Sequence, residues 1–149
     1  MRNYYFKSNP MAKTIVQKVL FKNTTPDKLY NLYMDAKLHS FVTEGPVTIS
    51  KKEGSSFSAH GNYITGKNLH IVPNQLIVQT WRAQSWSADD GDSVFTIALE
   101  PKGKDVVLHA VHTNLPDHAE ASVSKGWHDH YWNPWKQFLA GKPITIPKM

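Results

Sequence analysis

The segment from Pro116 to Leu139 carries large apolar side chains at helical spacing, and it constrains the fold more than any other part of the chain. Five of its residues follow one another at intervals of four, four, four and three positions: Val123, Trp127, Tyr131, Trp135 and Phe138. On an α-helix this spacing places the side chains in one stripe along a single face. A helix with so aromatic a stripe needs a broad apolar partner, which the rest of the chain has to supply.

The ends and the interior of this helix carry recognisable signals. Pro116 suits the first turn of a helix, and Gly141 is a plausible stop. Pro134 lies inside the segment, where it removes a backbone donor and predicts a kink over residues 130–134. Gly126 is disfavoured inside a helix and indicates close approach of another element, with a functional hinge as the alternative.

Length and composition indicate one globular domain. The chain has 149 residues, enough for a real hydrophobic core, and it has no cysteine. The absence of cysteine excludes disulfides, thiolate metal sites and cysteine nucleophiles. We find no apolar run long enough for a membrane span and no hydrophobic signal sequence, so we expect no membrane partner and a cytoplasmic protein.

The positive charge of the chain is spread out. The net charge is +5, yet the lysines are scattered and only two arginines occur, Arg2 and Arg82. A protein that reads nucleic acid usually has more arginine and a denser basic stripe. We therefore expect a solvated basic surface and no nucleic-acid partner.

The remaining segments predict an α+β fold. Two short helices, over residues 25–34 and 35–41, are expected directly after the first strand. Alternating patterns and turn signals predict seven strands in all, over residues 14–21, 47–51, 57–61, 64–72, 76–82, 93–100 and 105–113. Because short turns join most of them, we expect a curved antiparallel sheet around the long helix. We divide the chain into an N-terminal arm (1–13), one domain (14–141) and a C-terminal tail (142–149).

A space between sheet and helix is expected in such a fold. On residues 93–100 the side chains of Phe95, Ile97 and Leu99 share one face of the strand. On residues 105–113 we take His109 and Val111 as the matching inward positions. A twisted sheet wrapped around a helix leaves room for a small apolar molecule between the two.

Several short motifs, in order along the chain, resemble the C-terminal domain of the activator of the heat shock protein 90 ATPase. They include Thr43-Glu44-Gly45-Pro46, Val72-Pro73-Asn74-Gln75, Trp81-Arg82, Ser85-Trp86, Lys125-Gly126-Trp127 and Tyr131-Trp132. The resemblance extends over about residues 14–141. It places the chain in the START-like, Bet v 1-like (SRPBCC) superfamily.

This resemblance implies the helix-grip fold, in which a seven-stranded antiparallel sheet holds a long C-terminal helix and two short helices follow the first strand. It also implies a role without chemistry. Such a domain would bind a small hydrophobic molecule or a heat shock protein 90-type chaperone.

The candidate wall of the ligand cavity consists of Trp81, Phe95, Ile97, His109, Val111, Trp127, Tyr131 and Trp135. The alternative is that these are ordinary core residues, since aromatic stripes at helical spacing usually are.

A weaker candidate surface for a protein partner consists of Trp86, Arg82, Lys51 and Lys52. Trp86 lies in a predicted loop, where it is either an exposed contact or a lid over the cavity mouth. The two lysines and Arg82 are otherwise a solvated face.

Metal and cofactor sites have little support in the sequence. His128 and His130 are two positions apart, so on a helix they diverge, and His109 and His112 face opposite sides of a strand. We expect no metal and no cofactor. An enzyme of the cyclase or hydrolase type remains an alternative, with His109 and Tyr131 as the polar groups of the cavity, but we expect no catalysis.

Overall fold

The computed structural model describes residues 7–147 of the chain. Its elements, in chain order, are β1 (Lys13–Phe21), α1 (Pro26–Met34), α2 (Ala36–Thr43), β2 (Ser56–Ala59), β3 (Ile64–Val72), β4 (Leu76–Ala83), β5 (Ser93–Lys102), β6 (Asp105–Leu115), η1 (Asp117–Ala119), α3 (Glu120–Trp127), η2 (His128–Trp132) and α4 (Asn133–Leu139). The predicted α+β order is confirmed, with both short helices directly after the first strand.

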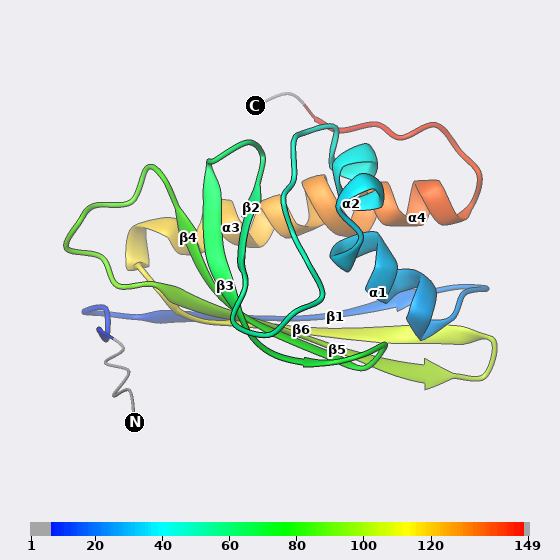
Figure 1. Cartoon of the computed structure of the whole chain (residues 1–149), viewed down its shortest axis with the longest axis horizontal. Coiled ribbons are helices and arrows are strands. Elements are labelled where there is room, and N and C mark those ends of the chain that lie inside the picture. Colours follow the sequence, from blue (N-terminus) through cyan, green and yellow to red (C-terminus); the bar gives the residue numbers. More distant parts are fainter. Residues whose placement is uncertain (1–6, 148–149) are drawn as a thin grey trace.

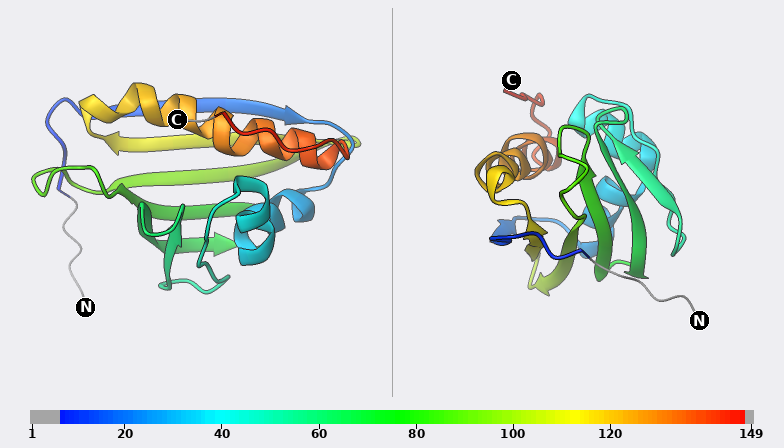
Figure 2. Two further views of the ribbon diagram at one scale, coloured as in Figure 1. Left: turned by 90° about the horizontal axis from the view of Figure 1, so that it is seen from above. Right: turned by 90° about the vertical axis from the view of Figure 1, so that its left-hand side faces the viewer.

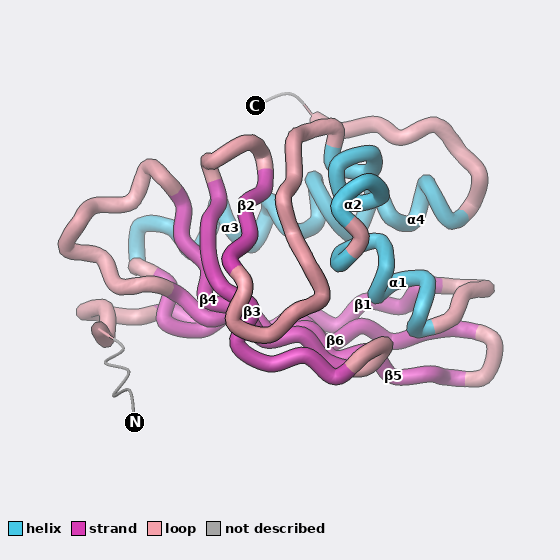
Figure 3. The backbone as a smooth tube through the Cα atoms, viewed as in Figure 1, coloured by secondary structure: helices cyan, strands magenta, loops and turns pink. Residues whose placement is uncertain are grey.

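The described strands form one sheet in the order β1-β6-β5-β4-β3-β2, and every neighbouring pair is antiparallel. Figure 3 shows these strands in magenta and the helices in cyan. Seen from its end, the sheet bends, so that β1, β6 and β5 lie below the C-terminal helical segment while β4, β3 and β2 rise beside it (Figure 2). The helical segment therefore lies in the angle of the sheet.

The expected strand over residues 47–51 is wrong, and the described sheet has six strands instead of seven. This segment meets the sheet only at an isolated bridge between Thr48 and Ser58. Beyond that point the carbonyl of Ser50 accepts a hydrogen bond from the side-chain amide of Asn68 at 2.8 Å, which takes the place of a further backbone pair. The alternating sequence pattern alone could not exclude a strand here, because it does not show which groups the backbone hydrogen-bonds with.

The C-terminal helical segment runs along the inner face of the sheet, from α3 at one end to α4 at the other (Figure 1). Helices α1 and α2 lie at the α4 end, and α2 contacts both η2 and α4. The side chains of Leu29, Leu32 and Tyr33 on α1 are fully buried, as their helical spacing requires. The core thus fills the angle between sheet and helices.

The irregularity expected at Pro134 takes the form of a π-helical turn, η2, directly before it. The backbone N–H of Asn133 donates to the carbonyl of His128, five residues earlier. Pro134, which has no backbone N–H, follows this turn in α4, and the backbone stays helical through Trp132 and Asn133. The rings of Trp127 and Trp132, also five residues apart, stack at 5.5 Å with 14° between their planes.

The inward face of β6 is the opposite of the one predicted. Phe95 on β5 pairs with His112, and Ile97 pairs with Ala110. Direct partners in an antiparallel pair point to the same side of the sheet, so His112 and Ala110 face the helix. His109 and Val111 face outward, and their prediction as inward residues is wrong. Both faces of β6 are largely apolar, so alternation alone did not distinguish them.

The last residues before β1 are tied to the body of the protein by Asn9, which is 4% exposed. Its side-chain amide donates to the carbonyls of Gly91 and Asn114, and its side-chain oxygen accepts from the N–H of Gly91. Tyr4, Tyr5 and Phe6 of the predicted N-terminal arm lie outside the described range.

Candidate functional site

A cavity of about 510 Å³ lies between the β3–β4 part of the sheet and the segment from η1 to η2. Aromatic rings and imidazoles form much of its lining: Tyr63, Trp81, Trp86, Trp127, Tyr131, His60, His118 and His130. Small and aliphatic residues complete it, and no aspartate, glutamate, lysine or arginine is among the lining residues. The cavity is therefore mostly apolar, with histidine and hydroxyl side chains as its polar groups.

Three indoles form one wall of the cavity. Trp81 is on the inward face of β4, and its ring centre lies 5.7 Å from that of Trp86 and 5.9 Å from that of Trp127. Trp127 in turn lies 4.8 Å from the ring of Tyr131. Trp127 and Tyr131 share a helix face because they are four residues apart. The wall is thus built jointly by sheet, loop and helix.

Hydrogen bonds through His112 connect two residues of this wall, Trp81 and Trp127. The hydroxyl of Ser93 donates to the carbonyl of Trp81 at 2.6 Å, so its oxygen accepts from Nε2 of His112 at 2.7 Å. Nδ1 of His112 then accepts from the indole N–H of Trp127 at 3.1 Å. Burial lowers the pKa of His112 to about 3. The ring is neutral at physiological pH, and both its nitrogens are occupied by protein groups.

A second buried histidine meets the hydroxyl of Tyr131. His39 on α2 is fully buried, and its Nε2 lies 2.9 Å from that hydroxyl. Burial lowers the pKa of His39 to about 4 and raises the pKa of Tyr131. His60 approaches the same hydroxyl from the cavity side, at 3.4 Å. Burial lowers the pKa of His60 as well, and nearby His130 adds to this effect.

The predicted cavity residues divide into three groups. Trp81, Trp127 and Tyr131 line the cavity. Phe95, Ile97 and Trp135 are at most 1% exposed and belong to the core, outside the cavity lining. His109 and Val111 lie on the outer face of β6, where the side chain of His109 is 41% exposed and pairs with Glu100.

The predicted partner surface is not a continuous exposed patch. Trp86 is only 8% exposed and lines the cavity, so its reading as an exposed contact is wrong and its position fits a cover over the cavity. Arg82 donates to the carbonyls of Ser87 and Asp90 and pairs with Asp92, which braces the loop that carries Trp86.

The lysines of that predicted surface remain accessible. Lys51 and Lys52 are both exposed. The ammonium of Lys51 donates to the side-chain oxygen of Asn31 and lies 5.7 Å from the ring centre of Tyr30.

Sequence reasoning missed the histidines that matter here. His39 shares the buried face of α2 with Val42, three residues on, so helical spacing indicated its burial. His112 was recognisable only from its pairing with Phe95. His60 lies in the turn after β2 with a φ of +52°, a conformation that is uncommon outside glycine, and its approach to Tyr131 depends on the tertiary fold.

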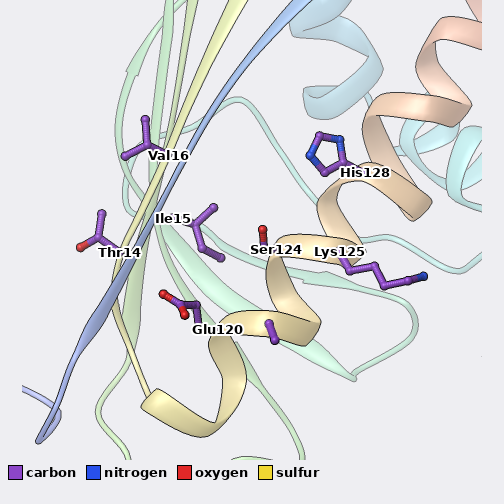
Figure 4. A pocket seen from close by; sticks show the side chains of 8 residues that line it. Thr14, Ile15, Val16, Glu120, Ser124, Lys125 and His128 are labelled. Carbon is purple, nitrogen blue, oxygen red and sulfur yellow. The ribbon is translucent and has the colours of Figure 1, made fainter.

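A second hollow, of about 520 Å³, lies where α3 passes the edge strand β1 (Figure 4). In that view Ile15 points toward α3, whereas Thr14 and Val16 point away from it. Lys125, Glu120 and His128 contribute polar groups, and Val16 is 73% exposed. This open, mixed surface is a weaker candidate site than the aromatic cavity.

Among residues 7–147, no cluster of three or more histidine, aspartate or glutamate side chains is placed to hold a metal ion. Within the same range, no helix combines the length and the apolar character needed to cross a membrane.

The bent antiparallel sheet, the helical segment along its inner face and the cavity between them define a START-like, SRPBCC-type domain. The chain belongs to the family described as "Activator of Hsp90 ATPase homolog 1-like protein", whose model matches residues 23–140. The predicted family resemblance is confirmed.

Two similar proteins carry names from that family. The chain is 32% identical over 120 residues to an "Activator of 90 kDa heat shock protein ATPase homolog" of Dictyostelium discoideum, a match that covers 79% of this chain and 30% of the relative. It is 25% identical over 114 residues to homolog 1 of Homo sapiens, a match that covers 76% of this chain and 33% of the relative. The chain therefore spans about a third of the length of these relatives.

Solved structures share the fold. An HSP90 activator from Plasmodium falciparum superposes with a TM-score of 0.76 at 20% identity, covering 89% of this chain and 97% of that one. CalU16 from Micromonospora echinospora superposes with a TM-score of 0.75 at 18% identity, covering 93% of this chain and 82% of that one. At such identities the likeness concerns the fold alone.

Proposed function

We propose that this chain is a START-like domain of the helix-grip type that binds a small hydrophobic molecule and performs no chemistry on it. The observation that carries the proposal is the cavity of about 510 Å³ beside Trp81, Trp127 and Tyr131. Concave, mostly apolar sites with a few convergent polar groups are typical of small-molecule binding. The lack of aspartate, glutamate, lysine and arginine in the lining favours an apolar occupant.

The polar groups near the cavity favour binding over catalysis. Both ring nitrogens of His112 and of His39 are engaged by protein atoms. The hydroxyl of Ser85, which also lines the cavity, lies 3.0 Å from that of Tyr63 and has no histidine partner among its hydrogen bonds. A serine nucleophile needs an adjacent base to be activated, and the hydrogen bond of Ser85 to Tyr63 does not provide one.

Filling the cavity tests the proposal. Gly126 lines it, and a Cβ at this position would meet only the ring of His130, at 3.9 Å. Gly126→Leu adds a side chain large enough to occupy the space, whereas Gly126→Ala adds a single methyl group. The uncharged dye Nile red should bind saturably to the wild type and to Gly126→Ala with increased emission, and about tenfold more weakly to Gly126→Leu. Saturable binding of equal strength to all three proteins would contradict a site in this cavity.

A second proposed function is binding to a heat shock protein 90-type chaperone in the cytoplasm. The family membership and the names of the relatives support it. Exposed Lys51 and Lys52, in a chain of net charge +5, suit an acidic partner surface. With purified chaperone, we expect saturable binding by calorimetry that weakens in the double variant Lys51→Glu, Lys52→Glu. Absence of binding by the wild type, with no change in the chaperone's ATPase rate, would remove this proposal.

A further inference from the structure

The hydroxyl of Tyr131 lies between two imidazoles at the inner side of the cavity. On the core side, Nε2 of fully buried His39 is 2.9 Å away. On the cavity side, Nε2 of His60 is 3.4 Å away, a long contact. The direction of these hydrogen bonds decides what the hydroxyl can offer to a bound molecule.

The position of the hydrogen follows from His39. Its Nδ1 lies 2.8 Å from the backbone carbonyl oxygen of Tyr33, which can only accept, so Nδ1 carries a hydrogen. Burial lowers the pKa of His39 to about 4, so the ring is neutral at physiological pH and Nε2 carries a lone pair. Tyr131 therefore donates its hydrogen to His39. The phenolic oxygen retains only lone pairs for any group on the cavity side.

The same side of the cavity offers no lysine or arginine to receive an anion. The rings of His60 and His130 meet edge to face with centres 5.7 Å apart. Burial and the neighbouring His130 both lower the pKa of His60, which keeps its ring neutral. No lysine or arginine is among the lining residues. A carboxylate placed here would lose its hydration without a compensating partner.

The shape of the wall favours a flat molecule. The indole of Trp81 neighbours the other two indoles, with its ring centre 5.7 Å from that of Trp86 and 5.9 Å from that of Trp127. Aromatic rings prefer to meet each other in offset-stacked or edge-to-face arrangements at such separations. A planar aromatic ligand can continue this series of rings.

We propose that the cavity takes a neutral, flat aromatic molecule that carries a hydroxyl group, and that this hydroxyl donates its hydrogen to the oxygen of Tyr131. The inference rests on the proposed small-molecule function and specifies its ligand. A ligand in which a methyl ether replaces the hydroxyl has no hydrogen to donate. It would also leave the phenolic oxygen with only the long contact to His60 on this side, which weakens binding.

Three naphthalene probes test this class directly: 2-naphthol, 2-methoxynaphthalene and the anion 2-naphthoate. We would measure their binding to the wild-type chain by equilibrium dialysis at neutral pH. The expected order is 2-naphthol first, 2-methoxynaphthalene about tenfold weaker, and 2-naphthoate weaker still. This comparison needs no variant, so it does not depend on how any substitution affects folding.

Two tyrosine variants locate the effect. Tyr131→Phe should bring the affinities for 2-naphthol and its methyl ether to within about twofold of each other. Tyr33→Phe is the matched control, because it also removes a buried hydroxyl, one that donates to Gln79 at 2.7 Å. Tyr33 is not part of the cavity lining, so this variant should keep the preference for 2-naphthol.

Several results would overturn the inference. They are equal binding of 2-naphthol and its methyl ether by the wild type, tightest binding of 2-naphthoate, or an unchanged preference in folded Tyr131→Phe. Binding of Nile red without binding of any naphthalene probe would reject this ligand class and leave the proposed function standing. Absence of binding by Nile red and all three probes would remove both.

Discussion

The rings of Trp127 and Phe95 lie almost parallel, with centres 3.9 Å apart and 9° between their planes. One residue belongs to α3 and the other to β5, one of the two central strands, so this stack joins the helix to the sheet. The hydrogen bond from the indole of Trp127 to His112 holds the same ring from a second direction. Trp127 is therefore fixed in position before any ligand arrives, and it forms a preorganised wall of the cavity.

Replacing His112 tests the importance of this arrangement. His112→Ala should lower the free energy of unfolding by about 2–4 kcal/mol, because it leaves a cavity and removes the partner of the buried indole N–H of Trp127. His109→Ala, on the outer face of the same strand, should change it by less than about 0.5 kcal/mol. Urea denaturation measures both values. Equal losses in the two variants would contradict the assignment of His112 to the inner face.

The stability of the fold should fall as the pH decreases below about 6.5. The pKa of His39 is about 4 in the folded state, against 6.5 in the unfolded chain, so the unfolded state binds more protons. Stability then rises with pH in this window, and it is lost as the pH falls from 6.5 toward 4. His112 acts in the same direction, with a folded pKa of about 3.

A glutamine at position 39 isolates this contribution. Its amide can occupy the place of the imidazole, but it does not titrate. The slope of unfolding free energy against pH, between about pH 6 and pH 5, should be smaller in His39→Gln by about 1.2 kcal/mol per pH unit. Denaturant titrations at several pH values measure this slope. A slope identical to that of the wild type would show that His39 does not stay neutral in the fold.

Gly66 should not tolerate a side chain. A Cβ at this position on β3 would lie 1.9 Å from the carbonyl oxygen of Thr80 and 2.6 Å from the ring of Phe57. The first contact is with backbone, so Gly66→Ala should cost at least about 3 kcal/mol of stability. Gly45→Ala is the control, since its nearest contacts of 3.6 and 3.7 Å are ordinary. Comparable thermal unfolding of the two variants would contradict the close approach of β3 and β4 at Gly66.

Asn9 should stabilise the two segments that it connects, around Gly91 and around Asn114. Asn9→Ala removes its bonds to Gly91 and to the carbonyl of Asn114, and it should lower stability by about 1–3 kcal/mol. Hydrogen exchange should accelerate at the amide of Gly91, which donates to Asn9 in the wild type. Exposed Ser8 provides the control, because Ser8→Ala should leave that exchange rate unchanged. Unaltered hydrogen exchange at Gly91 in Asn9→Ala would contradict a stabilising role for the hydrogen bonds between Asn9 and Gly91.

The sequence predicted elements whose signals are local. The spacing of Trp127, Tyr131 and Trp135 predicted a helix with a buried stripe, and all three residues are buried. Turn residues and alternation predicted every strand from β3 to β6, because hairpin chemistry depends on adjacent residues. Membership of the family also followed from short motifs in order along the chain.

Features that depend on pairing between distant segments were less accessible. The face of β6 that turns inward depends on its register with β5. The sequence pattern therefore predicted His109 as an inward residue, whereas the structure places His112 there. Residues 47–51 have a strand-like pattern but lack a partner strand along their length. Trp86 lies in a loop, yet its indole folds back against Trp81 and becomes buried.

The predicted apolar stripe of the C-terminal helix lacked Trp132, because its position also depends on the tertiary structure. Trp132 is fully buried, although a regular helix would place it off the stripe formed by Trp127 and Tyr131. The π-helical turn η2 brings Trp132 under Trp127. Such turns accommodate one more residue than an α-helical turn and have no simple sequence pattern.

The wide turn η2 also makes this stretch sensitive to chain length. Removing one residue between His128 and Trp132 would favour a regular α-helix and rotate everything after it by about 100° around the axis. Trp135 would then leave Phe21 on β1, and Phe138 would leave Phe41 on α2, while Trp127 kept its place against the sheet. Relatives that vary in length are therefore expected to do so in their surface loops, with the number of residues in this single turn held constant.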